Sequence, residues 1–338
     1  MKFRITWFRK KAKIKYKVNP GGIFALILFS VLLAFLCGEI LVRSVMLLPV
    51  KKEYLRFSCY EYRKIPGKNR DRDLFWKPLE DFRNVKYLKK KDKNTFRIIC
   101  IGDSITQGDA QEKGLLPLEQ TYVYKLEQLL AAKYKNKKIE VMNAGRGGYS
   151  SLQGLRYLKK TLWEYEPDLV ISWFGVNDYF HALFYSDKEQ RVPEDKDNIN
   201  YNILEKSKLF LFIKNFTFIK KSLKNPVVRV PPEDFYKNCE EMIIFGREKG
   251  FKIVFVAPFQ SGLNNKIEYF EGYPEKLDEL EKKYGCEVLY LNPFFLGKDM
   301  KSLYADSCHF NNEGNTIVAG ALFELLRGQW DKYLKKAR

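Results

Sequence analysis

The stretch Phe96-Arg97-Ile98-Ile99-Cys100-Ile101-Gly102-Asp103-Ser104 decides the fold of this chain. Its first six residues are apolar apart from Arg97, and the run stops at a glycine that is followed two positions later by a serine. This pattern is typical of a buried strand that delivers a hydroxyl group to the carboxyl edge of a sheet, where α/β proteins hold their reactive groups. The alternative is an ordinary strand-to-helix turn in which Ser104 caps the helix.

Strand and helix patterns alternate along the chain from this stretch onward. Strands are expected over 96–101, 139–142, 168–174, 252–256 and 287–291, and helices over 119–134, 151–165, 233–249 and 313–326. Pro232 opens the third of these helices and Gly250 closes it, as helix capping preferences require. The alternation predicts an α/β domain with a parallel sheet and helices on both faces.

The interval 182–230 interrupts this alternation. A polar stretch over 186–200 is followed by a basic and aromatic segment over 208–221. We interpret the interval as an insertion with three alternative roles. The alternatives are a lid over the site, a surface that contacts a membrane, and a covering helix that only packs against the domain.

The formal net charge of +19 is unevenly distributed, which bears on the partners of the chain. The first twenty residues contain eight lysines and arginines and no acidic residue, whereas basic and acidic residues are interleaved elsewhere. The sequence has no zinc-finger spacing and no other recognisable nucleic-acid motif. Nucleic acid is therefore not an expected partner.

An apolar run over 23–42 follows the basic tail, and Glu39 is its only charged residue. About twenty such residues span the hydrocarbon core of a bilayer. Two alternatives are a cleaved signal peptide and a lipoprotein signal. The run lacks a small-x-small cleavage site, and Leu36 before Cys37 disfavours lipoprotein processing, so we expect an uncleaved signal anchor. The positive-inside rule then places the tail in the cytoplasm and the residues after Leu48 on the extracytoplasmic side, periplasmic or extracellular.

These observations divide the chain into four parts. They are a basic cytoplasmic tail (1–22), a transmembrane anchor (23–48), a connector (49–95) and a main domain (96–330) that contains the insertion 182–230. The connector has turn signals without periodicity, so we expect it to pack loosely. Five cysteines follow the anchor without a CxxC pair or metal-ligand spacing, so no metal or other cofactor is predicted, and at most two disulfides could form among them.

A nucleophilic serine needs a base, a group that orients the base, and donors that stabilise the oxyanion. The chain contains only two histidines, His181 and His309. Asp306 precedes His309 by three residues in a polar loop, so its carboxylate can reach Nδ1–H and leave Nε2 free to accept the Ser104 proton. An Asp-x-x-His pattern alone is a weak signal, because it also caps helices.

Two further motifs follow the second and third predicted strands. Residues 143–150 form a glycine-dense turn, whose backbone N–H groups can approach a substrate oxygen without interference from a Cβ atom. Gly175-Val176-Asn177-Asp178 offers an asparagine amide that can donate to a developing negative charge. Each motif alone also suits a tight turn. Together with Ser104 and His309 they place Ser, Gly, Asn and Asp/His in chain order at successive strand ends.

In these four blocks the sequence resembles the SGNH (GDSL) hydrolases. The blocks are Gly-Asp-Ser at 102–104, the glycines at 143–148, Gly-Val-Asn-Asp at 175–178 and Asp-Ser-Cys-His at 306–309, and the resemblance extends over residues 95–330. It implies a flavodoxin-like three-layer α/β/α sandwich with a central parallel sheet. The chain lacks the Gly-x-Ser-x-Gly motif of the nucleophile elbow, so we do not expect the α/β-hydrolase fold.

The resemblance also implies the roles of the site residues. Ser104 is the nucleophile, His309 the base and Asp306 the acid that orients it. The oxyanion hole consists of the Ser104 N–H, the N–H of a glycine and the side chain of Asn177. The position of this glycine corresponds to Gly148, with Gly145 as the fallback.

Four more residues near these blocks are assigned to the surroundings of the pocket: Asp103, Asp178, Tyr179 and His181. We expect Asp103 to brace the nucleophile loop instead of acting as a second acid. His181 lines the acyl or alcohol pocket or, alternatively, is an exposed loop residue.

The sequence thus predicts a membrane-anchored serine esterase that hydrolyses acyl esters, acetyl esters among them, of a glycan or lipid outside the cytoplasm. The alternative is an O-acyltransferase that uses the same triad to modify a cell-envelope polysaccharide. A catalytically idle binding domain is disfavoured because every member of the triad is present.

Overall fold

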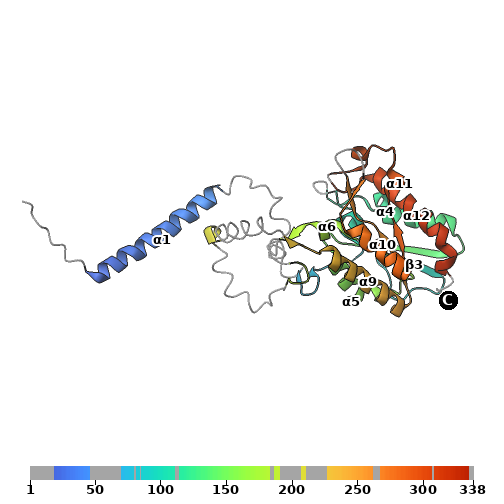
Figure 1. The fold of residues 1–338 in the computed structure, drawn as a ribbon, viewed down its shortest axis with the longest axis horizontal. Coiled ribbons are helices and arrows are strands. Elements are labelled where there is room, and N and C mark those ends of the chain that lie inside the picture. The colour runs from blue at the N-terminus through green and yellow to red at the C-terminus, as the bar shows by residue number, and fades with distance from the viewer. Residues whose placement is uncertain are drawn as a thin grey trace, which may run out of the picture. The chain divides into compact units, whose positions relative to one another are not determined.

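The computed structural model describes residues 19–45, 70–79, 81–83, 85–110, 114–182, 186–190, 207–210, 227–261, 267–306 and 308–334 of the 338-residue chain. The chain divides into two compact units. The first comprises residues 1–52 and 194–217, and the second comprises residues 53–193 and 218–338. Figure 1 shows the N-terminal helix of the first unit and the α/β domain of the second.

A five-stranded parallel sheet forms the centre of the second unit. Its strands in chain order are β3 (Thr95–Gly102), β4 (Lys138–Gly145), β5 (Leu169–Trp173), β8 (Lys252–Val256) and β11 (Glu287–Leu289). They lie in the order β4-β3-β5-β8-β11, which is the flavodoxin-like order and confirms the predicted fold class. Every residue of β3 is buried, because a central parallel strand is covered on both faces.

Two groups of helices cover the sheet (Figure 1). The long helices are α4 (Tyr122–Lys133), α5 (Ser151–Lys160), α9 (Pro232–Lys249), α10 (Tyr273–Tyr284) and α12 (Asn312–Leu334). Helix α4 packs against α12, whereas α9 packs against both α5 and α10. This arrangement is the one that right-handed crossovers produce on the two faces of such a sheet.

Short elements complete the second unit. They are β1 (Arg70–Asp71), β2 (Phe75–Trp76), α3 (Ser104–Gln107), α6 (Val176–Tyr179), β6 (His181–Ala182), β7 (Val227–Val228), β9 (Phe259–Ser261), β10 (Ile267–Tyr269), α11 (Asn292–Phe295) and three 3₁₀ turns (Leu118–Gln120, Leu162–Tyr165 and Met300–Leu303). Among them, β1 pairs with β2, β6 with β7 and β9 with β10, each antiparallel.

Three helices differ from the sequence-based expectation. Helix α5 ends at Lys160, and a separate 3₁₀ turn over Leu162–Tyr165 follows it, where one helix is expected over 151–165. Helix α10 was not expected, although glycines with positive φ, Gly272 and Gly285, flank it and a proline lies in its first turn. Helix α12 extends past residue 326, the predicted end, to Leu334. Trp330 in this extension is buried and stacks on Tyr134, so tertiary packing lengthens the helix.

The described part of the connector packs closely on the domain, contrary to the expectation of loose packing. Leu74 and Phe82 are only 2% and 5% exposed and belong to the hydrophobic core. The backbone carbonyl of Leu74 also accepts a hydrogen bond from the Gln153 amide at 2.7 Å. The sequence does not predict these contacts, because they are made by a few apolar side chains without periodic spacing in a segment rich in turn residues.

Helix α1 (Pro20–Val45) of the first unit is long and apolar enough to cross a membrane. Its large apolar side chains are exposed, for example Phe24 at 68% and Leu32 at 61%. A signal sequence close to an N-terminus has the same length and composition, so the helix by itself gives a candidate membrane span.

One described piece of the insertion, Ser207–Phe210, contacts α1 within the first unit. The carboxylate of Glu39 accepts hydrogen bonds from the Ser207 hydroxyl at 2.8 Å and from the backbone N–H groups of Lys208 and Leu209 at 2.9 and 2.8 Å. Most of the insertion lies outside the described residues, so its three alternative roles remain hypotheses.

Candidate active site

The carboxyl ends of β3, β4 and β5 bring three of the four sequence motifs together. Gly102 at the end of β3 pairs with Gly145 of β4 and with Trp173 of β5. Because adjacent parallel strands end at the same edge of a sheet, the loops that follow them meet there. The fourth motif reaches the same edge from the loop that precedes α12.

Ser104 is the first residue of α3, and the residue that caps this helix is Asp103. Oδ1 of Asp103 accepts a hydrogen bond from the Ile105 N–H at 2.8 Å. The alternative in which Ser104 caps the helix is therefore wrong. The turn requires Gly102, because a Cβ atom there would lie 2.1 Å from Oγ1 of Thr106.

His309 lies between Ser104 and Asp306. Its Nε2 is 2.8 Å from Oγ of Ser104, and its Nδ1 is 2.8 and 2.9 Å from the two carboxylate oxygens of Asp306. The side chain of His309 is 6% exposed. The structure thus brings the three residues together in the geometry that proton transfer from a serine requires.

The Asp306 carboxylate is held in its ionised form. Partial burial alone would raise its pKa, but hydrogen bonds from the backbone N–H groups of Cys308 and His309 and the neighbouring imidazole lower the pKa below its usual value. An ionised carboxylate at Nδ1 fixes the tautomer in which Nε2 accepts a proton.

A metal ion would compete with this arrangement. Asp306, Cys308 and His309 form a group within the described residues whose ligand atoms could surround a metal ion. Both ring nitrogens of His309 already contact Asp306 and Ser104, and Cys308 Sγ lies 3.4 Å from Nδ1. The residues therefore suit proton transfer, and a metal ion here would displace those contacts.

The glycine-dense turn after β4 offers one N–H group for an oxyanion. The Gly145 N–H donates to Asn143 Oδ1 at 3.1 Å, and the Gly147 N–H donates to Gln107 Oε1 at 2.5 Å. Within the described part of the chain, no group accepts a hydrogen bond from the N–H of Gly148 or of Ser104. Gly148, with φ of 79°, is therefore better placed for this role than the fallback Gly145.

Asn177 lies in α6 and is 5% exposed. Its Nδ2 donates to Asp103 Oδ2 at 3.1 Å, so one carboxylate braces both the nucleophile turn and this amide. Burial raises the pKa of Asp103 to about 6. The Ile105 N–H, the charge of His309 and the Asn177 amide act in the opposite direction and lower this pKa.

The other residues assigned to the pocket lie apart from the triad contacts. Asp178 is buried and accepts hydrogen bonds from the Ser151 N–H at 3.0 and 3.1 Å. Tyr179 is 40% exposed and stacks on Phe270, and His181 is exposed in β6. Among the described contacts, no hydrogen bond joins Asp178, Tyr179 or His181 to Ser104 or His309.

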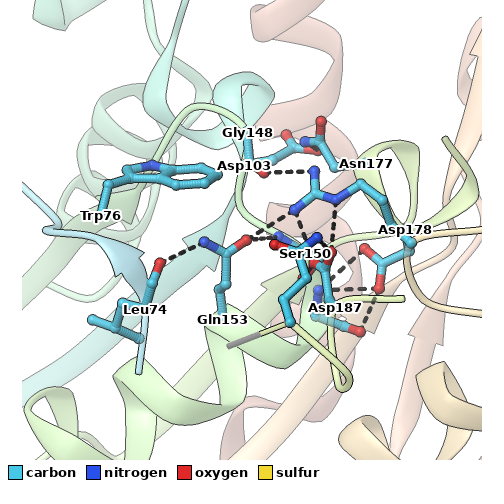
Figure 2. Close-up of polar contacts among 12 residues, drawn as sticks. Leu74, Trp76, Asp103, Gly148, Ser150, Gln153, Asn177, Asp178 and Asp187 are labelled. Atoms are coloured by element: carbon cyan, nitrogen blue, oxygen red, sulfur yellow. Dashed lines mark hydrogen bonds and ion pairs between the residues drawn. The ribbon is translucent and has the colours of Figure 1, made fainter. Parts of the chain in front are cut away.

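Sequence reasoning missed the side chains that surround Gly148. Figure 2 shows Trp76, Gln153 and Asp187 around this glycine, and Arg229 donates to its carbonyl at 2.9 Å. They come from the connector, from α5 and from the two ends of the insertion. Because each lies outside the motifs, no residue spacing indicated them.

The chain resembles known proteins in sequence and in fold. The model of the GDSL-like lipase/acylhydrolase family matches residues 100–317. The crystal structure of a lipase/acylhydrolase from Enterococcus faecalis is 20% identical, with 69% of this chain and 96% of that chain covered and a TM-score of 0.45. The crystal structure of Axe2, an acetylxylan esterase from Geobacillus stearothermophilus, is 17% identical, with 69% of this chain and 95% of that chain covered and a TM-score of 0.45. A search of curated proteins found no match.

Proposed function

Because the chain belongs to the GDSL-like lipase/acylhydrolase family and is a carboxylic ester hydrolase, we propose that it cleaves esters with Ser104, His309 and Asp306. The observation that carries this proposal is the 2.8 Å contact between Ser104 Oγ and His309 Nε2. The ionised Asp306 at the opposite ring nitrogen supports the same assignment.

The reaction follows from these contacts. His309 accepts the Ser104 proton as Oγ attacks the ester carbonyl, and Asp306 stabilises the resulting imidazolium. The N–H groups of Ser104 and Gly148 and the amide of Asn177 donate to the oxyanion of the tetrahedral intermediate. His309 then protonates the leaving alkoxide, and later activates the water that releases the acid from Ser104.

The substrate in this proposal is an acyl ester, such as an acetyl ester, of a glycan or lipid outside the cytoplasm. The length and exposed apolar surface of α1 suit a membrane span. The lack of a small-x-small cleavage site in the apolar run supports its retention as an anchor. The basic residues before it support a cytoplasmic N-terminus and an extracytoplasmic domain.

A fluorophosphonate probe tests the nucleophile on the full chain in native membranes. We expect the wild type and the matched variant Ser302→Ala to be labelled and to release p-nitrophenol from p-nitrophenyl acetate. We expect Ser104→Ala to do neither. Labelling and turnover of Ser104→Ala at the wild-type level would refute the assignment.

The acceptor of the acyl group and the topology need separate measurements. Acetate release should continue without added glycan if water is the acceptor, whereas a transferase would need the glycan and would acetylate it. A protease added to spheroplasts or protoplasts, from which the outer layers of the envelope have been removed, should degrade the domain after α1 and leave the basic tail. The opposite pattern would contradict the proposed topology.

A further inference from the structure

Hydrogen bonds hold the peptide groups on both sides of Gly148. The peptide before Gly148 carries its N–H, and the carbonyl of that peptide, Gly147 O, accepts from Trp76 Nε1 at 3.3 Å. The carbonyl of the next peptide, Gly148 O, accepts from Arg229 Nη1 at 2.9 Å. Because only φ and ψ rotate freely, fixing both flanking peptides fixes the direction of the Gly148 N–H.

An oxyanion donor needs such restraint at a glycine. With no Cβ atom, Gly148 at φ of 79° has many accessible conformations, and its N–H could turn away from the site. Oxyanion donors stabilise a transition state because they are oriented before the reaction. The Trp76 hydrogen bond also polarises the very peptide whose N–H is the donor, which strengthens that donor.

Arg229 is itself held in a fixed position. It forms a two-pronged ion pair with Asp187, with Nε–Oδ1 and Nη2–Oδ2 distances of 3.1 and 2.8 Å. The two side chains are 6% and 0% exposed. Nη2 also donates to Gln153 Oε1 at 3.0 Å, and Ser150 Oγ donates to Asp187 at 2.6 Å (Figure 2).

Trp76 is held by the same region of the chain. The Tyr149 hydroxyl donates to the Trp76 carbonyl at 2.6 Å, and the two rings lie 5.5 Å apart. Gln153 donates to the Leu74 carbonyl, which ties the β1–β2 hairpin to the start of α5. The indole is close to Gly148, since a Cβ atom on the glycine would lie 3.0 Å from Trp76 Cζ2.

We propose that Trp76 and Arg229 are positioning residues that orient the Gly148 N–H for the oxyanion, and that Asp187 holds Arg229. The inference rests on the proposed function, because it assumes that Gly148 is an oxyanion donor. Asp187 and Arg229 lie near the two ends of the insertion, and the Asp187 N–H donates to the Arg229 carbonyl at 2.7 Å. The base of the insertion is thereby joined to the oxyanion hole.

Two conservative variants of the full chain test the proposal. Trp76→Phe keeps a ring and removes the indole N–H, and Arg229→Lys keeps the charge and removes the planar fork that reaches Gly148 and Asp187 together. Each has a matched control far from the site. Trp163→Phe changes a tryptophan that contacts Lys249, and Arg97→Lys changes an equally buried arginine paired with Glu140 at the start of β3.

We expect Trp76→Phe and Arg229→Lys to lower kcat for p-nitrophenyl acetate by roughly tenfold, with KM within about twofold, because only transition-state stabilisation is lost. The affinity for an arylboronic acid, whose adduct on Ser104 carries a tetrahedral oxygen, should fall by a similar factor. The controls should keep kcat even where thermal stability falls. Unchanged kcat in both test variants, or equal losses in tests and controls, would overturn the proposal.

Hydrogen exchange provides a readout that does not depend on turnover. Peptides covering residues 143–151 should exchange faster in Trp76→Phe and Arg229→Lys than in the wild type and the controls. If the wild type showed no more turnover than Ser104→Ala while this exchange still rose, the proposed function would fail and the restraint on Gly148 would stand. If exchange did not change, the restraint itself would be refuted.

Discussion

The carboxylate of Asp103 joins the nucleophile turn to Asn177. Its Oδ1 accepts the Ile105 N–H at 2.8 Å, and its Oδ2 accepts an amide hydrogen of Asn177 at 3.1 Å. An ionised carboxylate offers only acceptors, so it can hold both donors at once. In the proposed mechanism, the second amide hydrogen of Asn177 donates to the oxyanion.

Asp103→Asn should disturb this arrangement without removing any residue of the triad. An asparagine has one acceptor oxygen and a donating amide, so it cannot satisfy both the Ile105 N–H and Asn177 as the carboxylate does. We expect kcat for p-nitrophenyl acetate to fall by roughly tenfold with little change in KM. Asp73→Asn, at an exposed position, is the control, and wild-type kcat in Asp103→Asn would contradict the bracing role.

Asn177→Ala tests the amide directly. Removing one oxyanion donor typically lowers kcat by about a hundred- to a thousandfold, and we expect a loss in this range. Steady-state kinetics on the purified full chain measure it, and Asn94→Ala, on an exposed turn, serves as the control. Full esterase activity in Asn177→Ala would show that this amide does not take part in the oxyanion hole.

The sequence predicted the sheet and the convergence of its motifs for a simple physical reason. The buried strand before Gly102 and the glycine turn after residue 142 follow local rules of burial and backbone freedom. Parallel strands then bring such turns to one edge, so the order of motifs in the chain predicted that Ser104 and Asn177 would lie near each other.

Residues whose role depends on distant contacts were not predictable in this way. Trp76 precedes its partner Gly147 by 71 residues, and Arg229 follows Gly148 by 81 residues. Neither sits at a periodic position or in a motif, so only the folded chain reveals them. Helix α10 is a different case, because local sequence signals do mark it: glycines flank it, and an amphipathic pattern lies between them.

Asp178 should make stability depend on pH. Burial raises the pKa of this carboxyl to about 7, against hydrogen bonds from Ser151 and the charge of Arg229 that lower it. The folded chain therefore keeps a proton on Asp178 that the unfolded chain releases above about pH 4. The contribution of this carboxyl group to the free energy of unfolding falls as the pH rises from 4 to 7.

Asp178→Asn removes this titration while keeping an acceptor for Ser151. Between pH 5 and pH 7 the wild type should lose about 2 kcal/mol more unfolding free energy than Asp178→Asn. Urea denaturation of the full chain in detergent at both pH values measures the difference. Equal changes in the two proteins would contradict the raised pKa.

The contact between α1 and Ser207–Phe210 predicts a specific cross-link. A Cβ atom on Gly38 would lie 3.6 Å from Cγ of Leu209, the position that a cysteine sulfur would occupy, so cysteines at these two positions can approach disulfide geometry. In a Cys37→Ser background, Gly38→Cys with Leu209→Cys should form the disulfide on mild oxidation in membranes, shifting mobility on a non-reducing gel. Leu28→Cys with Leu209→Cys is the control, since Leu28 lies about 15 Å along the helix from Gly38. Equal yields from the two cysteine pairs would contradict the contact. A lower yield after Glu39→Gln would show that the Glu39 carboxylate stabilises the contact.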